Sequence, residues 1–157
     1  MDFRIRRLAS SSDIHECALL MSSSEPWITL QRDYNKSLKV FAEDLNETYV
    51  ADKDGQILGF IILQLKGAFV GYIRSLGVIP EMRGLGIGER LLDFAEKIVF
   101  NEHPNLFICV SSFNLRAREL YERHGFKVVG ELDEFIVPGH SEILMRKTRG
   151  PLCEFII

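Results

Sequence analysis

The chain has few cysteines, no long apolar run and no excess of basic residues, and each absence excludes a class of protein. Its 157 residues include three widely spaced cysteines. An odd, scattered set of this kind is not a disulfide framework, and the N-terminus carries no apolar leader segment. The sequence therefore predicts a reduced, cytoplasmic protein. No apolar segment reaches the roughly 20 residues that a helix needs to cross a bilayer, so we expect no membrane partner.

Charge and histidine content exclude two further classes. The 19 basic residues face 22 acidic ones, for a net charge of −3, so no basic surface for nucleic acid is indicated. The four histidines show none of the short spacings that hold metal ions, and we predict no metal site. Length and a hydrophobic fraction of 46% predict one domain over residues 1–157. The short apolar tail at 152–157 suggests a homodimer or pairing with a sheet edge.

Hydrophobic periodicity predicts strands that alternate with helices. We expect strands over residues 3–8, 48–52, 57–65, 69–79, 105–110, 126–136 and 141–147. We expect helices over residues 11–21, 29–41, 85–101 and 114–124. This order predicts an α/β (α+β) fold in which a mixed sheet is packed against helices, with one parallel unit formed by the strand ending at Ile79, the helix after it and the strand from Asn105.

A glycine run lies between the strand ending at Ile79 and the helix that follows it. Its members are Arg83, Gly84, Leu85, Gly86, Ile87 and Gly88. Glycines let a ligand approach the backbone closely, and the helix directs its free N–H groups and positive dipole end at the loop. The run predicts a cradle for a phosphate or diphosphate. It lacks the Lys-Ser/Thr of a P-loop and the G-x-G-x-x-G of a dinucleotide site, and a glycine-rich helix start without a ligand is the alternative.

Three further residues sharpen the chemistry. Gly77, inside the strand before the glycine run, is typical of a bulge or of a close backbone approach. Asn114 and Tyr121 are seven residues apart, which places them on the same side of one helix. A tyrosine phenol is protonated at neutral pH and can give a proton to a departing thiolate. Packing at the edge of the core is the alternative for Tyr121.

Two segments resemble motifs of the GNAT (Gcn5-related) N-acetyltransferase superfamily. Residues 78–88 are similar to its acetyl-CoA diphosphate motif, and residues 114–126 are similar to its N-x-x-A-x-x-L-Y-x-x-x-G-F signature. The resemblance implies a mostly antiparallel sheet in which two central parallel strands splay apart at the cofactor site, with helices on both faces. It implies acetyl-CoA as acyl donor and a primary amine of a small molecule or a protein as acceptor. A non-catalytic module that binds or senses acyl-CoA is the alternative.

The resemblance also implies a role for each motif residue. The backbone amides of residues 83–88 would hold the CoA diphosphate. Leu76 and Val78, on either side of Gly77, would bond the pantetheine arm, and Asn114 would lie near that arm. Tyr121 would protonate the CoA thiolate after the amine has attacked the thioester directly, without an acyl-enzyme.

The general base is not assigned by either motif. In the branch of the family that acetylates ribosomal-protein N-termini, a glutamate acts as base at the position of Cys109 here, and Ser111 replaces a neighbouring arginine, which argues against an N-terminal peptide as acceptor. Glu25 is the candidate base, because it lies in the variable region that shapes acceptor sites in this superfamily. A solvent-facing Glu25, with ordered water carrying the proton away, is the alternative. We expect Trp27 and Tyr34 to wall the acceptor pocket, unless they only pack the first two helices.

Overall fold

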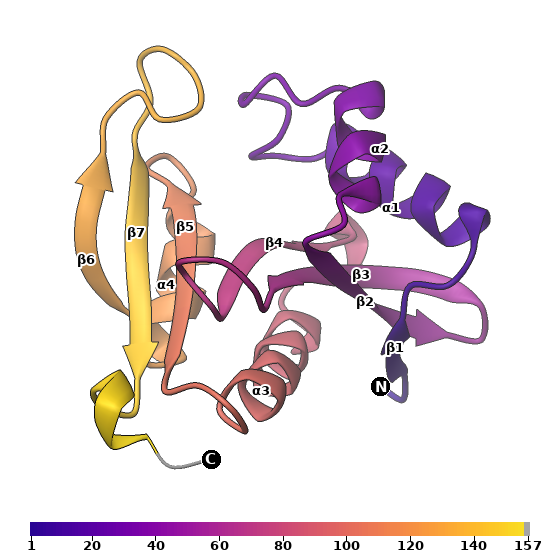
Figure 1. The fold of residues 1–157 in the computed structure, drawn as a ribbon. Coiled ribbons are helices and arrows are strands. Elements are labelled where there is room, and N and C mark those ends of the chain that lie inside the picture. The colour runs from indigo at the N-terminus through magenta and orange to yellow at the C-terminus, as the bar shows by residue number, and fades with distance from the viewer. Residues whose placement is uncertain (156–157) are drawn as a thin grey trace.

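The computed structural model describes residues 1–155, and one sheet with the strand order β1-β2-β3-β4-β5-β7-β6 runs through them (Figure 1). The strands are β1 (Arg4–Arg7), β2 (Asn46–Lys53), β3 (Gln56–Gln64), β4 (Tyr72–Val78), β5 (Asn105–Ser111), β6 (Lys127–Leu132) and β7 (Glu142–Thr148). The helices are α1 (Ser11–Ser22), α2 (Tyr34–Ala42), α3 (Ile87–Val99) and α4 (Leu115–Arg123), and short 3₁₀ turns cover Pro80–Met82 and Leu152–Glu154. Every neighbouring pair of strands is antiparallel except β4 and β5. The predicted fold class is confirmed.

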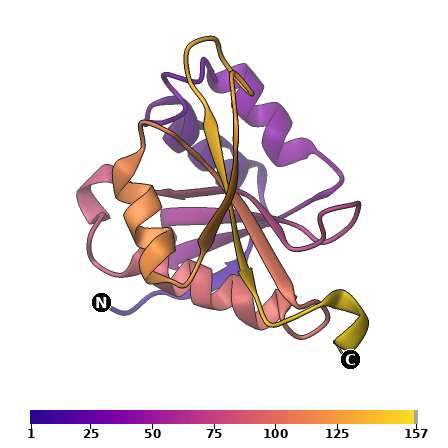
Figure 2. The ribbon, with the colours of Figure 1, turned by 90° about the vertical axis from the view of Figure 1, so that its left-hand side faces the viewer.

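The helices cover both faces of the sheet, and each face has its own core. On one face α1 and α2 pack over β2 and β3, around Phe60 and Trp27. On the other face α3 packs against β3, β4 and β5, and Tyr121 of α4 joins the same core. Figure 2 shows the two pairs of helices on opposite sides of the strands. Among residues 1–155, no helix combines the length and the apolar composition that a bilayer span requires.

The two parallel strands separate almost as soon as they meet. They pair only at Tyr72 with Phe107 and at Ile73 with Ile108. Beyond these pairs, β4 stays bonded to β3, while β5 stays bonded to β7. Figure 1 shows β5, β6 and β7 together on one side and β1 to β4 on the other. The sheet therefore opens into a fork at the carboxyl ends of β4 and β5.

Two local details differ from the sequence prediction. Helix α2 begins at Tyr34 instead of near Thr29, because the Asp33 side chain caps it and Gln31 adopts a left-handed φ of 57°, which no helix accommodates. The bulge of β4 falls at Arg74 instead of Gly77, opposite the register shift between residues 62 and 63 of β3. Gly77 is needed for another reason, since a Cβ there would lie 2.8 Å from the Phe60 ring.

The predicted apolar tail is only partly described. Residues 152–154 form a 3₁₀ turn, and residues 156–157 lie outside the described residues. The homodimer expected from this tail stays a prediction.

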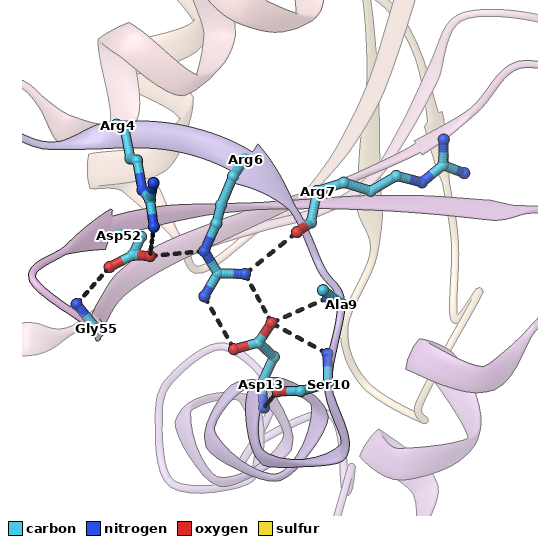
Figure 3. A network of polar contacts seen from close by, with 8 residues as sticks. All are labelled: Arg4, Arg6, Arg7, Ala9, Ser10, Asp13, Asp52 and Gly55. Atoms are coloured by element: carbon cyan, nitrogen blue, oxygen red, sulfur yellow. Dashed lines mark hydrogen bonds and ion pairs between the residues drawn. The ribbon is translucent and has the colours of Figure 1, made fainter.

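A buried ion network ties β1 to α1 and β2 (Figure 3). The Arg6 guanidinium donates to the Asp52 carboxylate at 2.6 Å and to both Asp13 oxygens at 2.7 and 3.0 Å. The Asp52 and Asp13 side chains are only 2% and 11% exposed. The hydrogen bonds from Arg6 hold the pKa of each carboxyl below its usual range. Their stabilising effect is therefore fully present above the ordinary aspartate pKa and is lost as the pH falls below it.

Replacing Arg6 is expected to destabilise the fold strongly. Arg6→Ala leaves two buried carboxylates without their shared partner, which costs about 3 kcal/mol of unfolding free energy at pH 7. Arg4→Ala is the matched control, because Arg4 reaches the same Asp52 oxygen at 3.3 Å from a side chain that is 75% exposed; its loss is expected to cost less than about 1 kcal/mol. Urea unfolding of both variants checks this, and equal losses would contradict the assigned role of Arg6.

Candidate active site

A cavity of about 680 Å³ opens at the fork between β4 and β5. Its walls come from the ends of these two strands, the glycine run, α4, β7 and the segments at residues 25–32 and 135–136. Parts of the chain more than 100 residues apart therefore meet around one space. A volume of this size suits a ligand of drug or cofactor dimensions.

The glycine run forms a loop that ends at the N-terminus of α3. Gly84 and Gly86 adopt left-handed φ values of 78° and 85°, which side-chain-bearing residues rarely take. Gly86 is the N-cap of α3 and has no side chain to occupy the free N–H groups of the first turn. Leu85 is exposed and Ile87 is buried in the core. Ile87 therefore anchors the loop in the core and Leu85 points toward solvent, while the glycines of the run line the cavity.

Two guanidinium groups flank this loop. Arg83 donates from Nε to the Val78 carbonyl at 3.1 Å, which fixes its side chain beside the fork. The Arg116 side chain, from the first turn of α4, lies close to Gly84. A Cβ added to Gly84 would be 3.2 Å from Arg116 Nη2. Burial and the positive charge of Arg116 both lower the pKa of Arg83. Two cations held side by side next to a helix N-terminus favour a doubly charged anion. Arg116 lies inside the second motif, but only the fold reveals its proximity to the loop.

The free edge of β4 presents backbone groups to the fork. The Ile79 N–H donates to the Leu58 carbonyl of β3 at 2.9 Å. Because successive residues of a strand direct their N–H and C=O groups to opposite sides, those of Leu76 and Val78 point away from β3 and toward the fork. An extended ligand between β4 and β5 can bond them as a strand would.

Asn114 and Tyr121 are both brought to the cavity by α4. The Asn114 Oδ1 accepts the Ala117 N–H at 3.3 Å and so caps the helix, while its amide nitrogen makes no hydrogen bond within residues 1–155. Tyr121 is 5% exposed and packs in the core beside Phe126. Its hydroxyl has no hydrogen-bond partner in the described part of the chain, and burial raises its pKa. The phenol is therefore held protonated beside the fork.

A second group of residues lines the cavity and was not assigned to the site by the sequence analysis. Its members are Arg32, Tyr72, Arg74, Cys109 and Glu142. Burial raises the pKa values of Tyr72, Cys109 and Glu142. The Cys109 thiol is therefore kept protonated, as is typical of an unreactive buried cysteine.

The three acceptor-side residues named from the sequence have different surroundings. Trp27 is buried and lines the cavity, against Gly77. Glu25 also lines the cavity, but it is exposed, and its two oxygens accept the Thr29 hydroxyl at 3.0 Å and the Thr29 N–H at 3.2 Å. Tyr34 is not among the lining residues; its hydroxyl contacts His15 Nδ1 at 2.7 Å. The geometry therefore gives the prediction for Tyr34 no support.

Comparison with known proteins places this geometry in a family. The sequence profile of the acetyltransferase (GNAT) family matches residues 12–126. An uncharacterized N-acetyltransferase of Methanocaldococcus jannaschii is 37% identical over 110 residues, covering 66% of this chain and 70% of the relative. An N-alpha-acetyltransferase of Sulfolobus acidocaldarius is 26% identical over 156 residues, covering 88% of this chain and 89% of the relative. An aminoglycoside 6′-N-acetyltransferase solved with coenzyme A superposes with a TM-score of 0.76 at 17% identity, over 94% of this chain and 98% of that one.

The fork, the glycine loop and the family match define an acetyl-CoA-dependent acyltransferase. The chain belongs to the GNAT family and is an N-acetyltransferase. The residues present fit such a donor, because the free N–H groups at the start of α3 could hold a diphosphate and the open edge of β4 could bond a pantetheine arm.

Proposed function

We propose that the protein transfers an acetyl group from acetyl-CoA directly to a primary amine of a small molecule or a protein. The observation that carries this proposal is the protonated Tyr121 phenol, buried beside the fork and free of any hydrogen-bond partner in residues 1–155. A non-catalytic module that only binds acyl-CoA needs the glycine loop but not a proton donor at this point.

The proposal assigns the two halves of the cavity to the two substrates. Residues 83–88 and the Arg83 and Arg116 side chains bind the diphosphate of the donor. The backbone groups of Leu76 and Val78, around Gly77, and the Asn114 amide align its pantetheine arm. Tyr121 gives its proton to the sulfur that leaves. Donors fixed where negative charge develops stabilise a transition state more than mobile water does.

The acceptor enters from the side where Trp27 and Glu25 line the cavity. Trp27 offers an apolar wall, and Glu25 is a candidate base at the rim. One relative is named an N-alpha-acetyltransferase and one structural neighbour acts on aminoglycosides. Cys109 and Ser111 stand where the resemblance implies a glutamate base and an arginine in the enzymes that act on ribosomal N-termini. A small amine and a protein amine therefore both remain in the proposal.

An amine panel tests the function directly. Purified protein is incubated with acetyl-CoA and with polyamines, aminoglycosides, lysine peptides and N-terminal peptides, and release of the free CoA thiol is measured. We expect release above the rate of hydrolysis with at least one class. Tight CoA binding without release for any amine would favour the non-catalytic alternative.

Coenzyme A is expected to stabilise the folded protein whatever the acceptor. At a CoA concentration one hundredfold above its Kd, a ligand that binds only the folded state adds about 2.7 kcal/mol to the unfolding free energy. A thermal-shift titration measures this. Dephospho-CoA, which keeps the diphosphate, and free pantetheine, which lacks it, are titrated beside CoA. We expect pantetheine to stabilise the protein far less than either of the other two.

A further inference from the structure

Glu142, the first residue of β7, is a buried carboxylate in the wall of the cavity. It is 3% exposed and accepts one hydrogen bond, from the Ser111 hydroxyl at 2.6 Å. No cation lies within ion-pair distance of it in the part of the chain that the structure describes. A buried charge that lacks a close partner is costly, so its retention calls for an explanation.

The register of β5 and β7 places Glu142 on the acceptor side of the sheet. Ile108 and Val110 face the core under α3, as do their partners Met145 and Ile143 on β7. Side chains of a strand alternate between its faces. Ser111 and its partner Glu142 therefore face the other side, where the acceptor half of the cavity lies.

The groups around Glu142 act on its pKa in opposite directions. Burial, the largest influence, raises its pKa, while the Ser111 hydrogen bond and the Arg32 guanidinium lower it. The Tyr72 hydroxyl and the Cys109 thiol also face it, and their own pKa values are raised, so both stay neutral. The Arg32 guanidinium itself makes no ion pair within residues 1–155. A carboxylate whose pKa is raised is a stronger proton acceptor than one at its ordinary pKa.

We propose that Glu142 binds the acceptor ammonium and takes its proton. The proposal rests on the proposed function and names the base for it. One N–H bond of the ammonium breaks and the proton passes to a Glu142 oxygen. The neutral amine then forms a C–N bond to the acetyl carbon, and the C–S bond breaks. The thiolate receives the Tyr121 proton, the new amide nitrogen gives its remaining extra proton to the tyrosinate, and Glu142 returns its proton to water.

Glu25 is the rival carboxylate, and its setting is less suited to the task. It is exposed, and both of its oxygens accept hydrogen bonds from Thr29. Glu142 keeps lone pairs free in a site sheltered from water. A desolvated carboxylate attracts an ammonium more strongly than an exposed one does.

Three glutamine variants test the proposal with the amine that is the best acceptor in the panel. Glu142→Gln keeps the shape of the side chain and an oxygen for the Ser111 hydroxyl. Glu131→Gln is the matched control, because Glu131 accepts the Ser141 hydroxyl at 2.6 Å on exposed β6, outside the cavity. Glu25→Gln is the rival variant. The readouts are kcat/KM between pH 6 and 10, the Kd of CoA, and the melting temperature against pH.

Glu142→Gln is expected to lower kcat/KM by about 10²-fold at pH 7, with the Kd of CoA unchanged. The deficit should shrink about tenfold per pH unit toward the pKa of the amine, near 10.4 for a lysine-like amine, because solution then supplies the free amine. Glu131→Gln should match the wild type at every pH. The proposal would be overturned if Glu142→Gln kept the wild-type pH profile of kcat/KM. It would also be overturned if Glu25→Gln were the only variant whose kcat/KM is low at pH 7 and recovers at high pH.

Stability gives a readout that does not depend on activity. Because the pKa of Glu142 is raised on folding, its contribution to stability is fully present below the ordinary glutamate pKa and is lost as the pH rises through the folded value. The melting temperature of Glu142→Gln relative to the wild type should therefore rise between pH 4.5 and 8. A difference that does not change with pH would overturn the proposal. If the wild-type protein binds CoA but acetylates no amine, the proposed function fails, and the role of Glu142 fails with it.

Discussion

Tyr121→Phe is expected to lower kcat for acetyl transfer by about 10²–10⁴-fold, the usual contribution of a general acid. The variant loses one hydroxyl, and with it the proton that neutralises the departing thiolate. The hydroxyl has no hydrogen-bond partner in the described part of the chain, whereas the ring packs in the core. The fold should therefore tolerate the change, and the Kd of CoA should hardly move.

The measurement is steady-state release of the CoA thiol, together with calorimetric titration of CoA. Tyr49→Phe is the control, because Tyr49 is a half-buried tyrosine that packs edge-on against Phe94 and does not line the cavity. An unchanged kcat in Tyr121→Phe would show that water or another group protonates the thiolate. A lost kcat with equally weakened CoA binding would show that the hydroxyl holds the donor instead of protonating it.

Gly86→Asp is expected to weaken CoA binding on the order of 10²-fold or more. The new carboxylate would stand at the N-terminus of α3, in the place proposed for the diphosphate. Two unit charges 4 Å apart repel by about 4 kcal/mol at the effective dielectric constant of a protein surface. Aspartate tolerates a left-handed φ better than most residues do. The helix should therefore survive while the ligand is repelled.

Gly67→Asp provides the matched control for this experiment. Gly67 also has a left-handed φ, 96°, a Cβ added there would meet no atom within 4 Å, and the residue does not line the cavity. Calorimetric titration of both variants with CoA should show a large loss for Gly86→Asp and none for Gly67→Asp. Unchanged affinity in Gly86→Asp, with the fold intact by circular dichroism, would mean that the diphosphate binds elsewhere.

The half of the site that we assign to the donor could be outlined from the sequence because its signals are local. The glycine run and the spacing of Asn114 and Tyr121 each fall within one loop or one helix, where backbone geometry follows from neighbouring residues. The parallel unit that joins them follows from the order of strand, helix and strand. The single parallel pair and the helices on both faces of the sheet confirm the predicted fold class.

The acceptor half could not be predicted because it depends on contacts between distant parts of the chain. Arg32, Tyr72 and Glu142 come from a loop and two strands, and only the register of β5 with β7 brings Glu142 to the cavity. In sequence, Glu142 is one polar residue of an alternating strand, and such residues usually face water. Here Glu142, at the start of β7, lies buried in the cavity wall instead. The late start of α2 followed from the Asp33 cap and the backbone of Gln31, which periodicity does not encode.

A structure of the protein with coenzyme A bound is the most direct test of the central claim. The account predicts diphosphate oxygens within hydrogen-bond distance of the amides of residues 84–88, the arm between β4 and β5, and the sulfur within reach of the Tyr121 hydroxyl. A nucleotide bound away from the N-terminus of α3, or a sulfur on the far side of β4 from Tyr121, would contradict it.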